Sequence, residues 1–291
     1  MPGSTAGQFT NLQGSIEVEG SFSLEKTLHC GQVFRFYFKE GKIFLPYLNS
    51  LLKLEEKSST IYYSVFGEAL SDLQIKKILG LNHSINKINS YLAKRDPRFK
   101  IVIEFANGLR IMSLPPYETA ISFIFSIQSS IPVIKKRLNT LSEYAGHCIE
   151  IGGEKFHLFP KSSDLKSLSK KEISLLKLGF REKFFAEFIK KYDETFFENL
   201  KQLNYEEKRK ELLKIKGIGE KVGQCILLFS LDELSAFPVD VWIKRGMKYF
   251  FNEVGTERKL SETGRKIFGE FAGYAQEYMY YFLRFSDVKT C

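Results

Sequence analysis

Cysteine is scarce in this sequence, and the cysteines that occur are not paired along the chain. The 291 residues contain four of them, at Cys30, Cys148, Cys225 and Cys291. None belongs to a C-x-x-C pair, so the sequence indicates neither a structural zinc site nor an iron–sulfur cluster, and we expect no metal and no other cofactor. Sparse cysteine without a secretion signal is typical of proteins in a reducing cytosol.

Long apolar runs are also absent. No stretch of about 18 consecutive apolar residues occurs, which is the length that predicts a membrane-spanning helix. The first residues, Met1–Gln8, lack the basic and apolar regions of a signal peptide, and we expect them to form a flexible leader. The sequence therefore predicts a cytoplasmic protein that does not span a membrane.

Basic side chains outnumber acidic ones. The 43 lysines and arginines against 34 aspartates and glutamates give a formal net charge of +9 and a pI of about 9.1. This balance favours a polyanionic partner such as nucleic acid, although a solvated lysine-rich surface gives the same composition. Hydrophobic residues make up 44% of the chain, which is enough to bury one large core or two packed domains.

The first part of the chain is rich in residues that favour strands. Val33–Phe38 and Ile43–Leu45 flank Glu40-Gly41, which predicts a β-hairpin with its turn at those two residues. Further strands are predicted over residues 51–54 and 60–66. Pro46 fits an edge strand or a bulge, because proline cannot donate a ladder hydrogen bond. We expect an antiparallel sheet here.

From about Ser71 the apolar residues recur with helical spacing. Ser169 and Glu172 form a capping-box sequence that predicts a helix start, and Gly179 is the expected stop. The predicted class is α+β: a small antiparallel sheet domain over residues 1–110, with short helices, precedes a helical domain over residues 111–291. The other predicted helices cover Ser71–Leu79, Asn82–Leu92, Pro116–Ser126, Pro132–Tyr144, Arg181–Tyr192, Tyr205–Lys214, Glu220–Leu231, Val241–Phe250 and about Leu260–Phe285.

One turn between two predicted helices carries a recognisable pattern. Gly217-Ile218-Gly219 separates the helices, and both glycines allow positive φ and the close approach of another backbone. The free amides at the start of the second helix can hold a phosphate. This predicts a helix–hairpin–helix that binds the DNA backbone, while an ordinary glycine-containing corner between helices remains the alternative.

Two titratable residues follow this turn in the sequence. Lys221 falls in the first turn of the second helix, where the helix dipole and neighbouring Lys216 disfavour its ammonium form. A neutral amine is what a lysine nucleophile requires. Asp240 follows Pro238-Val239 and is the predicted N-cap of the next helix. The alternatives are a solvated surface lysine and an aspartate that only caps its helix.

The hairpin with Lys221, followed by Pro238-Val239-Asp240, resembles the helix–hairpin–helix, Gly/Pro-Asp DNA glycosylases. More narrowly, the sequence resembles the 8-oxoguanine DNA glycosylase/AP lyase family from about residue 28 to residue 287, because Cys30–Arg35, Leu178–Arg181 and Gly273–Gln276 also match. The resemblance implies a base-excision-repair enzyme that flips 8-oxoguanine out of double-stranded DNA. It also implies a monomer in the cytoplasm, associated with the nucleoid if the cell is bacterial.

The same resemblance assigns the catalytic roles. Lys221 would be the nucleophile that attacks C1′ of the sugar, and Asp240 would stabilise the positive charge that develops there. A Schiff base to Lys221 would then allow β-elimination and a strand nick.

The resemblance also assigns a pocket for the flipped base. The carbonyl of Gly31 would accept a hydrogen bond from N7–H, which the oxidised base has and guanine lacks. Cys225 and Tyr280 would sandwich the base, with Tyr280 replacing the more usual phenylalanine, and Gln276 would bind its Watson–Crick edge. Without the resemblance, Gly31 is a loop glycine and Cys225 and Tyr280 are core residues.

DNA contacts outside the base pocket are implied as well. Phe180 would fill the gap in the base stack and Arg181 would face the unpaired cytosine, with a buried phenylalanine as the alternative for Phe180. The other expected contacts with DNA are Gln128, Gly217, Gly219 and Trp242.

The chain departs from the family at three places on this surface. Gln128–Ser130 replaces an asparagine pair, Val133 replaces an arginine that recognises cytosine in some members, and Trp242 replaces a histidine. We therefore expect weaker selection of the opposite cytosine, with the nucleophile unaffected.

Two other functions fit the same sequence. One is a glycosylase for another damaged purine, and the other is a DNA-binding module that kept the hairpin without catalysis. An adenine-specific relative commonly carries four cluster-binding cysteines, which this chain lacks. Borohydride trapping on lesion DNA separates an enzyme from a binding module, and competition with free bases separates the two enzymes.

Overall fold

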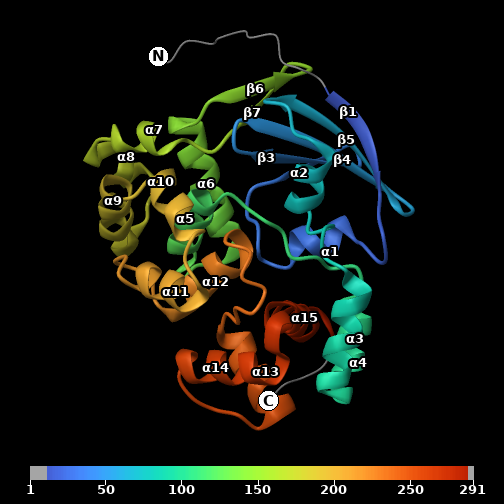
Figure 1. The fold of residues 1–291 in the computed structure, drawn as a ribbon. Coiled ribbons are helices and arrows are strands. Elements are labelled where there is room, and N and C mark those ends of the chain that lie inside the picture. Colours follow the sequence, from blue (N-terminus) through green and yellow to red (C-terminus); the bar gives the residue numbers. More distant parts are fainter. Residues whose placement is uncertain (1–11, 288–291) are drawn as a thin grey trace.

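A computed structural model describes residues 12–287 and confirms the predicted α+β class (Figure 1). Five strands form one antiparallel sheet in the order β1-β5-β4-β3-β2, and most of the later chain is helical. The leader Met1–Gln8 and Cys291 lie outside the described residues. No helix within the described part of the chain is long and apolar enough to cross a membrane.

The predicted hairpin turn is present between the strands β2 and β3. Glu40 and Gly41 both have positive φ, 48° and 72°, and Lys39 pairs with Lys42 across the turn. Pro46 of β3 pairs with Leu51 of β4 on one side only, because β2 pairs with residues 42–44 and does not reach it on the other side. Its missing N–H therefore costs no ladder hydrogen bond. The strands are β1 (Leu12–Glu17), β2 (Tyr37–Lys39), β3 (Lys42–Tyr47), β4 (Ser50–Lys57) and β5 (Thr60–Gly67).

Strand β1 and a second, two-stranded sheet were not predicted. Only Ile16 of β1 is buried, so the strand carries almost no alternation of apolar and polar residues. The second sheet pairs β6 (Cys148–Ile151) with β7 (Glu154–His157). Its Ile149 and Phe156 pack with Phe44 and Leu51, so this hairpin covers one face of the large sheet.

Most predicted helices are present, and two differ. The second predicted helix begins at Ile85, with Ser84 at its N-cap, and not at Asn82. The predicted helix over 260–285 is wrong as one element: Gly269, with φ 60° and ψ −135°, ends α14 and a short 3-10 turn separates it from α15. The α-helices are α1 (Leu24–His29), α2 (Asp72–Ile78), α3 (Ile85–Arg95), α4 (Lys100–Phe105), α5 (Pro116–Ser126), α6 (Ile131–Ala145), α7 (Ser162–Lys166), α8 (Lys170–Leu175), α9 (Glu182–Lys191), α10 (Glu194–Leu200), α11 (Tyr205–Leu213), α12 (Glu220–Ser230), α13 (Val241–Phe251), α14 (Glu257–Phe268) and α15 (Ala272–Phe285).

The capping box at Ser169 is confirmed, since its hydroxyl accepts from the Glu172 amide and the Glu172 carboxylate accepts in return. The expected stop at Gly179 is displaced. Helix α8 already ends at Leu175, and Gly179, with φ 60°, opens the 3-10 turn η2 (Gly179–Arg181).

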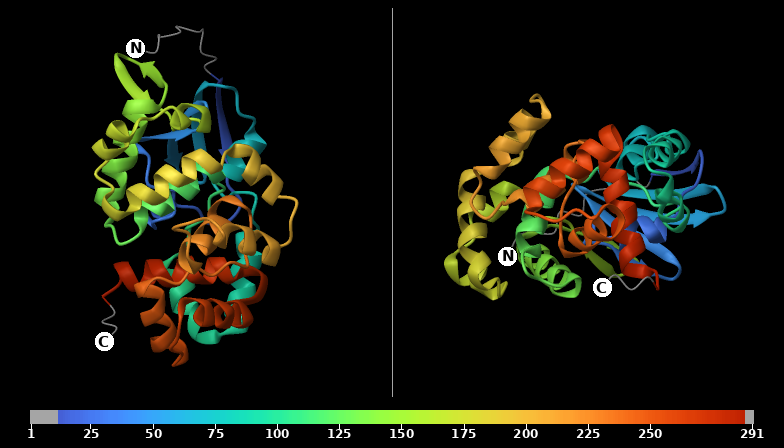
Figure 2. Two further views of the ribbon diagram at one scale, coloured as in Figure 1. Left: turned by 90° about the vertical axis from the view of Figure 1, so that its left-hand side faces the viewer. Right: turned by 90° about the horizontal axis from the view of Figure 1, so that it is seen from below.

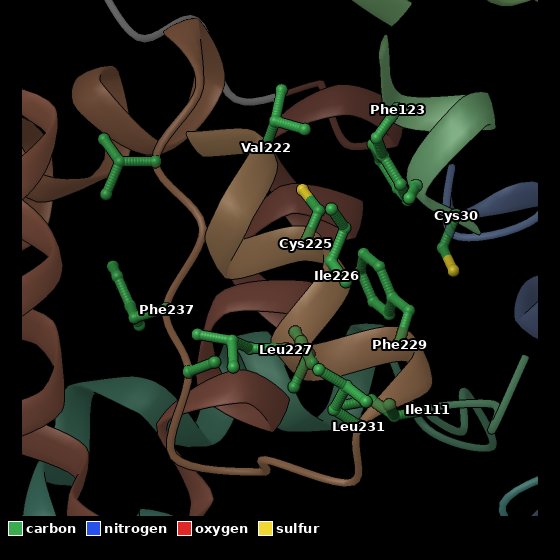
Figure 3. Packing of buried hydrophobic residues seen from close by; sticks show 14 of the residues in the cluster. Cys30, Ile111, Phe123, Val222, Cys225, Ile226, Leu227, Phe229, Leu231 and Phe237 are labelled. Carbon is green, nitrogen blue, oxygen red and sulfur yellow. The ribbon is translucent and has the colours of Figure 1, made fainter. Parts of the chain in front are cut away.

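Helix α12 lies in the middle of the helical part. Figure 3 shows its buried side chains between Phe123 of α5 and Phe237 of the segment that follows α12. The rings of Phe123 and Phe229 stack with centroids 5.7 Å apart. Helices α3 and α4 contact α14 and α15, so they lie beside the last helices of the chain (Figures 1 and 2). This packing brings α12, α13 and α15 together around one cavity.

Candidate active site

The turn between α11 and α12 uses its two glycines differently. Gly217 has φ 91°, and a Cβ there would lie 2.7 Å from the Phe184 side chain. Gly219 has φ −91°, so the expectation of positive φ at both glycines is wrong for this one. No side chain caps α12 at Gly219, and a Cβ there would meet nothing within 4 Å. The start of α12 is therefore open to a ligand.

A partly buried polar network fixes this turn. Arg209 of α11 binds both carboxylate oxygens of Glu220 through Nε and Nη2, at 2.8 and 2.5 Å. Gln224, which is 1% exposed, donates from Nε2 to Glu220 at 3.0 Å. Its Oε1 accepts from the Tyr205 hydroxyl at 2.8 Å and from the Phe237 amide at 3.0 Å. Gln224 thus ties the helix that carries Lys221 to the segment that leads to Asp240.

Lys221 and Asp240 face one cavity of about 780 Å³. Asp240 caps α13 as predicted, with Oδ1 accepting from the Ile243 amide at 2.9 Å. Burial raises the pKa of the Asp240 carboxyl, against the opposing effect of that amide and of Lys221. The Lys221 Nζ lies 4.9 Å from the centre of the Phe123 ring. Lys216, whose charge was expected to act on Lys221, pairs through its ammonium with the Glu187 carboxylate at 3.1 Å.

The four residues expected to hold a base line the same cavity: Gly31, Cys225, Gln276 and Tyr280. Burial raises the pKa of the Cys225 thiol to about 12, so the thiol is neutral. The Tyr280 hydroxyl accepts a hydrogen bond from Nη1 of Arg284, and it would lie 3.3 Å from a Cβ on Gly31, whose φ is 95°. Gln276 Oε1 is buried without a hydrogen-bond partner in the described part of the chain.

The loop that carries Gly31 is held in place partly by residues 110 and 112. Gln32, 1% exposed, donates to the carbonyls of Thr27 and Arg110 at 2.8 Å and accepts from the Met112 amide at 2.8 Å. Because both polar atoms of the Gln32 side chain are bonded, the position of Gly31 relative to the helices is fixed.

Some of the residues expected at the DNA surface line the cavity and others lie outside it. Gln128, with φ 46°, and Trp242 line the cavity, as do Gly217 and Gly219. Phe180 stands outside the lining and is 46% exposed, so it is not the buried phenylalanine of the alternative.

Arg181 differs most from the expectation. Its side chain is buried and lies outside the cavity lining. Its Nη2 donates to the Gln128 carbonyl at 2.8 Å, Nη1 to that of Leu178 at 3.1 Å, and Nε to that of Ile127. In this structure the guanidinium supports the Gln128 loop.

Sequence reasoning missed a buried carboxyl at the cavity. Glu277 is 3% exposed, lines the cavity, and follows Gln276 on α15. Burial raises its pKa to about 8. The signal was its position as an acid inside the apolar run Tyr274–Met279. Other cavity residues not predicted include Phe123, Lys244 and Arg284.

Known proteins resemble this chain in sequence. The sequence profile of the 8-oxoguanine DNA glycosylase N-terminal domain matches residues 15–120. The N-glycosylase/DNA lyase OGG1 of Arabidopsis thaliana is 27% identical over 89% of this chain and 76% of its own length. The probable N-glycosylase/DNA lyase of Methanothermobacter thermautotrophicus is 28% identical over 74% of this chain and 75% of its own length.

A solved structure extends the similarity over nearly the whole chain. The Clostridium acetobutylicum 8-oxoguanine glycosylase/lyase, in complex with double-stranded DNA containing cytosine opposite 8-oxoguanine, superposes with a TM-score of 0.87. It is 28% identical, and the match covers 97% of this chain and 99% of that one. The chain therefore belongs to the 8-oxoguanine DNA glycosylase family.

Proposed function

We propose that this chain is a DNA glycosylase with AP lyase activity that excises 8-oxoguanine from double-stranded DNA. The observation that carries the proposal is that Lys221 at the start of α12 and Asp240 at the start of α13 face one cavity. Its volume of about 780 Å³ is in the range that holds a ligand the size of a nucleotide. Cytoplasmic location, with association to the nucleoid if the cell is bacterial, and a monomeric state remain part of the proposal.

In the proposed reaction, Nζ of Lys221 attacks C1′ of the flipped nucleotide. The C1′–N9 bond breaks and its electron pair leaves with the base, which takes up a proton. The Asp240 carboxylate stabilises the positive charge that develops on the sugar. Opening of the sugar ring gives a Schiff base between Lys221 and C1′. Loss of a proton from C2′ and of the 3′ phosphate then completes β-elimination.

The pocket residues would recognise the base. The Gly31 carbonyl would accept from N7–H, and the neutral Cys225 thiol and the Tyr280 ring would lie on its two faces. Gln276 Oε1, unpartnered among the described residues, would accept from the Watson–Crick edge. The open amides at Gly219, together with the Gly217 turn, would hold a phosphate of the same strand.

Borohydride trapping tests the nucleophile. A duplex with 8-oxoguanine opposite cytosine is incubated with the protein and borohydride, which reduces a Schiff base to a stable covalent complex. The wild type should be trapped, and Lys221→Gln should bind the duplex without being trapped or excising the base. Lys216→Gln, a nearby change of the same kind, serves as the control and should be trapped normally. Equal trapping of wild type and Lys221→Gln contradicts the assignment, and excision of a different damaged purine only would change the substrate.

A further inference from the structure

Glu277 is a buried acid that the proposed reaction does not use. It lies on α15 between Gln276 and Tyr280, is 3% exposed, and lines the cavity. Its Oε2 has no hydrogen-bond partner among residues 12–287. A buried polar atom without a partner is rare in a folded protein, so a ligand in the cavity is the natural partner for it.

The neighbours of Glu277 define which part of a ligand it faces. Its carboxyl lies near the Cys30 thiol, which precedes Gly31, and near the Gln276 side chain, and both groups act to lower its pKa. Glu277 therefore stands between the group proposed for N7–H and the group proposed for the Watson–Crick edge. On a guanine ring the exocyclic atom between N7 and N1 is O6, which only accepts hydrogen bonds.

The protonation of Glu277 suits a donor. Burial raises its pKa to about 8 and the charge of Asp240 at the start of α13 acts in the same direction. Cys30, Lys221 on α12, and the Gln276 amide oppose this shift without overcoming it. At neutral pH the group is therefore a carboxylic acid, which carries one O–H donor.

We propose that Glu277 is a further specificity-determining residue, whose carboxylic acid donates a hydrogen bond from Oε2 to O6 of the flipped oxidised guanine. The inference rests on the proposed function, since it needs a purine in the cavity. It assigns the enzyme a preference for oxidised purines that carry a carbonyl at position 6, beyond the recognition of N7–H.

Single-turnover excision rates test the proposal, with two substitutions at Glu277 and two substrate bases. Glu277→Gln keeps a donor of similar shape, and Glu277→Leu removes it. Glu270→Leu, at an exposed position just before the same helix, is the control. The substrates are 8-oxoguanine and its 6-thio analogue, in which sulfur, a weak acceptor, replaces O6 while the N–H donors stay.

For 8-oxoguanine, we expect Glu277→Leu to excise on the order of 10-fold more slowly than wild type, with Glu277→Gln and Glu270→Leu near wild type. The wild type should excise the 6-thio base about 10-fold more slowly than 8-oxoguanine, and Glu277→Leu should show no further loss on it. The ratio of wild-type to Glu277→Gln rates should fall as the pH rises through about 8, because only the wild-type group loses its donor proton.

Three outcomes overturn the inference: an unchanged rate for Glu277→Leu, an equal 6-thio penalty in wild type and Glu277→Leu, or a rate ratio independent of pH. If Glu277→Leu does not fold, the pH dependence of the Glu277→Gln ratio decides alone. A wild-type protein that excises neither base contradicts the proposed function itself. That result is therefore distinguishable from a failure of the Glu277 assignment.

Discussion

At the scale of single residues, the cavity combines side chains that a sequence pattern identifies with others that it cannot. Lys221 and Asp240 follow recognisable glycine and proline motifs, so they were predictable. Glu277 carries no motif, and only the packing of α15 against α12 shows that its carboxyl is buried. The placement of Arg181 was also beyond prediction, since two of its three partners are carbonyls of residues about 50 positions away.

The buried Glu277 makes folding stability depend on pH. The ordinary pKa of a glutamate carboxyl is 4.5, and burial in the folded protein raises it to about 8. Between these values the folded state keeps a proton that the unfolded state loses, so the free energy of unfolding falls as the pH rises. Glu277→Gln removes this dependence and should be more stable than wild type at pH 8, by on the order of a few kcal/mol, but not at pH 4. Denaturant unfolding at both pH values measures this, with Glu270→Gln as the control. Parallel stability curves for wild type and Glu277→Gln would show that Glu277 is not a buried acid.

A second prediction concerns Val133 and the preference for the base opposite the lesion. By the family resemblance it stands where some members have an arginine that donates to cytosine. It is 41% exposed and lies in the first turn of α6, next to the cavity residues Pro132 and Ile134. With Arg181 bound to carbonyls, we expect only modest differences in excision opposite the four bases. A base-edge hydrogen bond is worth about 1–3 kcal/mol, so Val133→Arg should favour cytosine by on the order of 10-fold or more. Single-turnover excision from four duplexes measures this, and Val254→Arg, an exposed valine elsewhere, adds the same charge as a control. A steep preference for cytosine in the wild type would refute the expectation.

At the scale of elements, capping and glycine signals predicted the helices well where local chemistry decides their ends. Asp240 and Ser169 cap the helices they were expected to cap. The β6–β7 hairpin was missed because only Ile149 and Phe156 are clearly buried in it, and the large sheet supplies their partners. The break at Gly269 was missed because its cause is tertiary: a Cβ there would collide with the Tyr91 hydroxyl.

The hairpin glycines allow a matched test of fold against DNA binding. Gly217→Ala places a Cβ against Phe184 in a backbone with φ 91°, so it should destabilise the protein by on the order of 1–3 kcal/mol. Gly219→Ala meets no atom within 4 Å and has negative φ, so stability should change little. Its methyl would occupy the space in which a phosphate approaches the amides, so DNA affinity should fall. Thermal unfolding and fluorescence anisotropy separate the two effects. Unchanged DNA affinity in a folded Gly219→Ala would show that α12 does not hold the phosphate.

At the scale of the whole molecule, the cavity is assembled from distant parts of the sequence. Gly31 comes from the loop after α1, and the other proposed base contacts come from α12 and α15. Arg110, fully buried, donates to the carbonyls of Glu19, Ser21 and His83, and the Tyr274 hydroxyl of α15 bonds His83 and the Ile111 amide. The division into parts at residues 110 and 111 stays a prediction, and these contacts hold its two sides together.

The net charge of +9 predicts how affinity responds to salt. Binding to the DNA backbone releases counterions, so affinity for a lesion duplex should fall by on the order of 100-fold or more between about 50 and 200 mM salt. Anisotropy titrations at four salt concentrations measure the slope, and thermal unfolding at the same concentrations shows that the protein stays folded. A flat dependence would indicate that DNA phosphates contribute little to binding.

The hydrogen bonds of Gln32 have a consequence for how lesion choice can change by mutation. A backbone carbonyl such as that of Gly31 cannot be replaced by any substitution, so its contribution to selectivity changes only when the groups that orient it change. In this fold the Gln32 side-chain amide sets that orientation through its bonds to backbone groups of Thr27, Arg110 and Met112. Variants with altered discrimination between guanine and its oxidised form should therefore accumulate at Gln32, behind the carbonyl, while every side chain that touches the base stays the same.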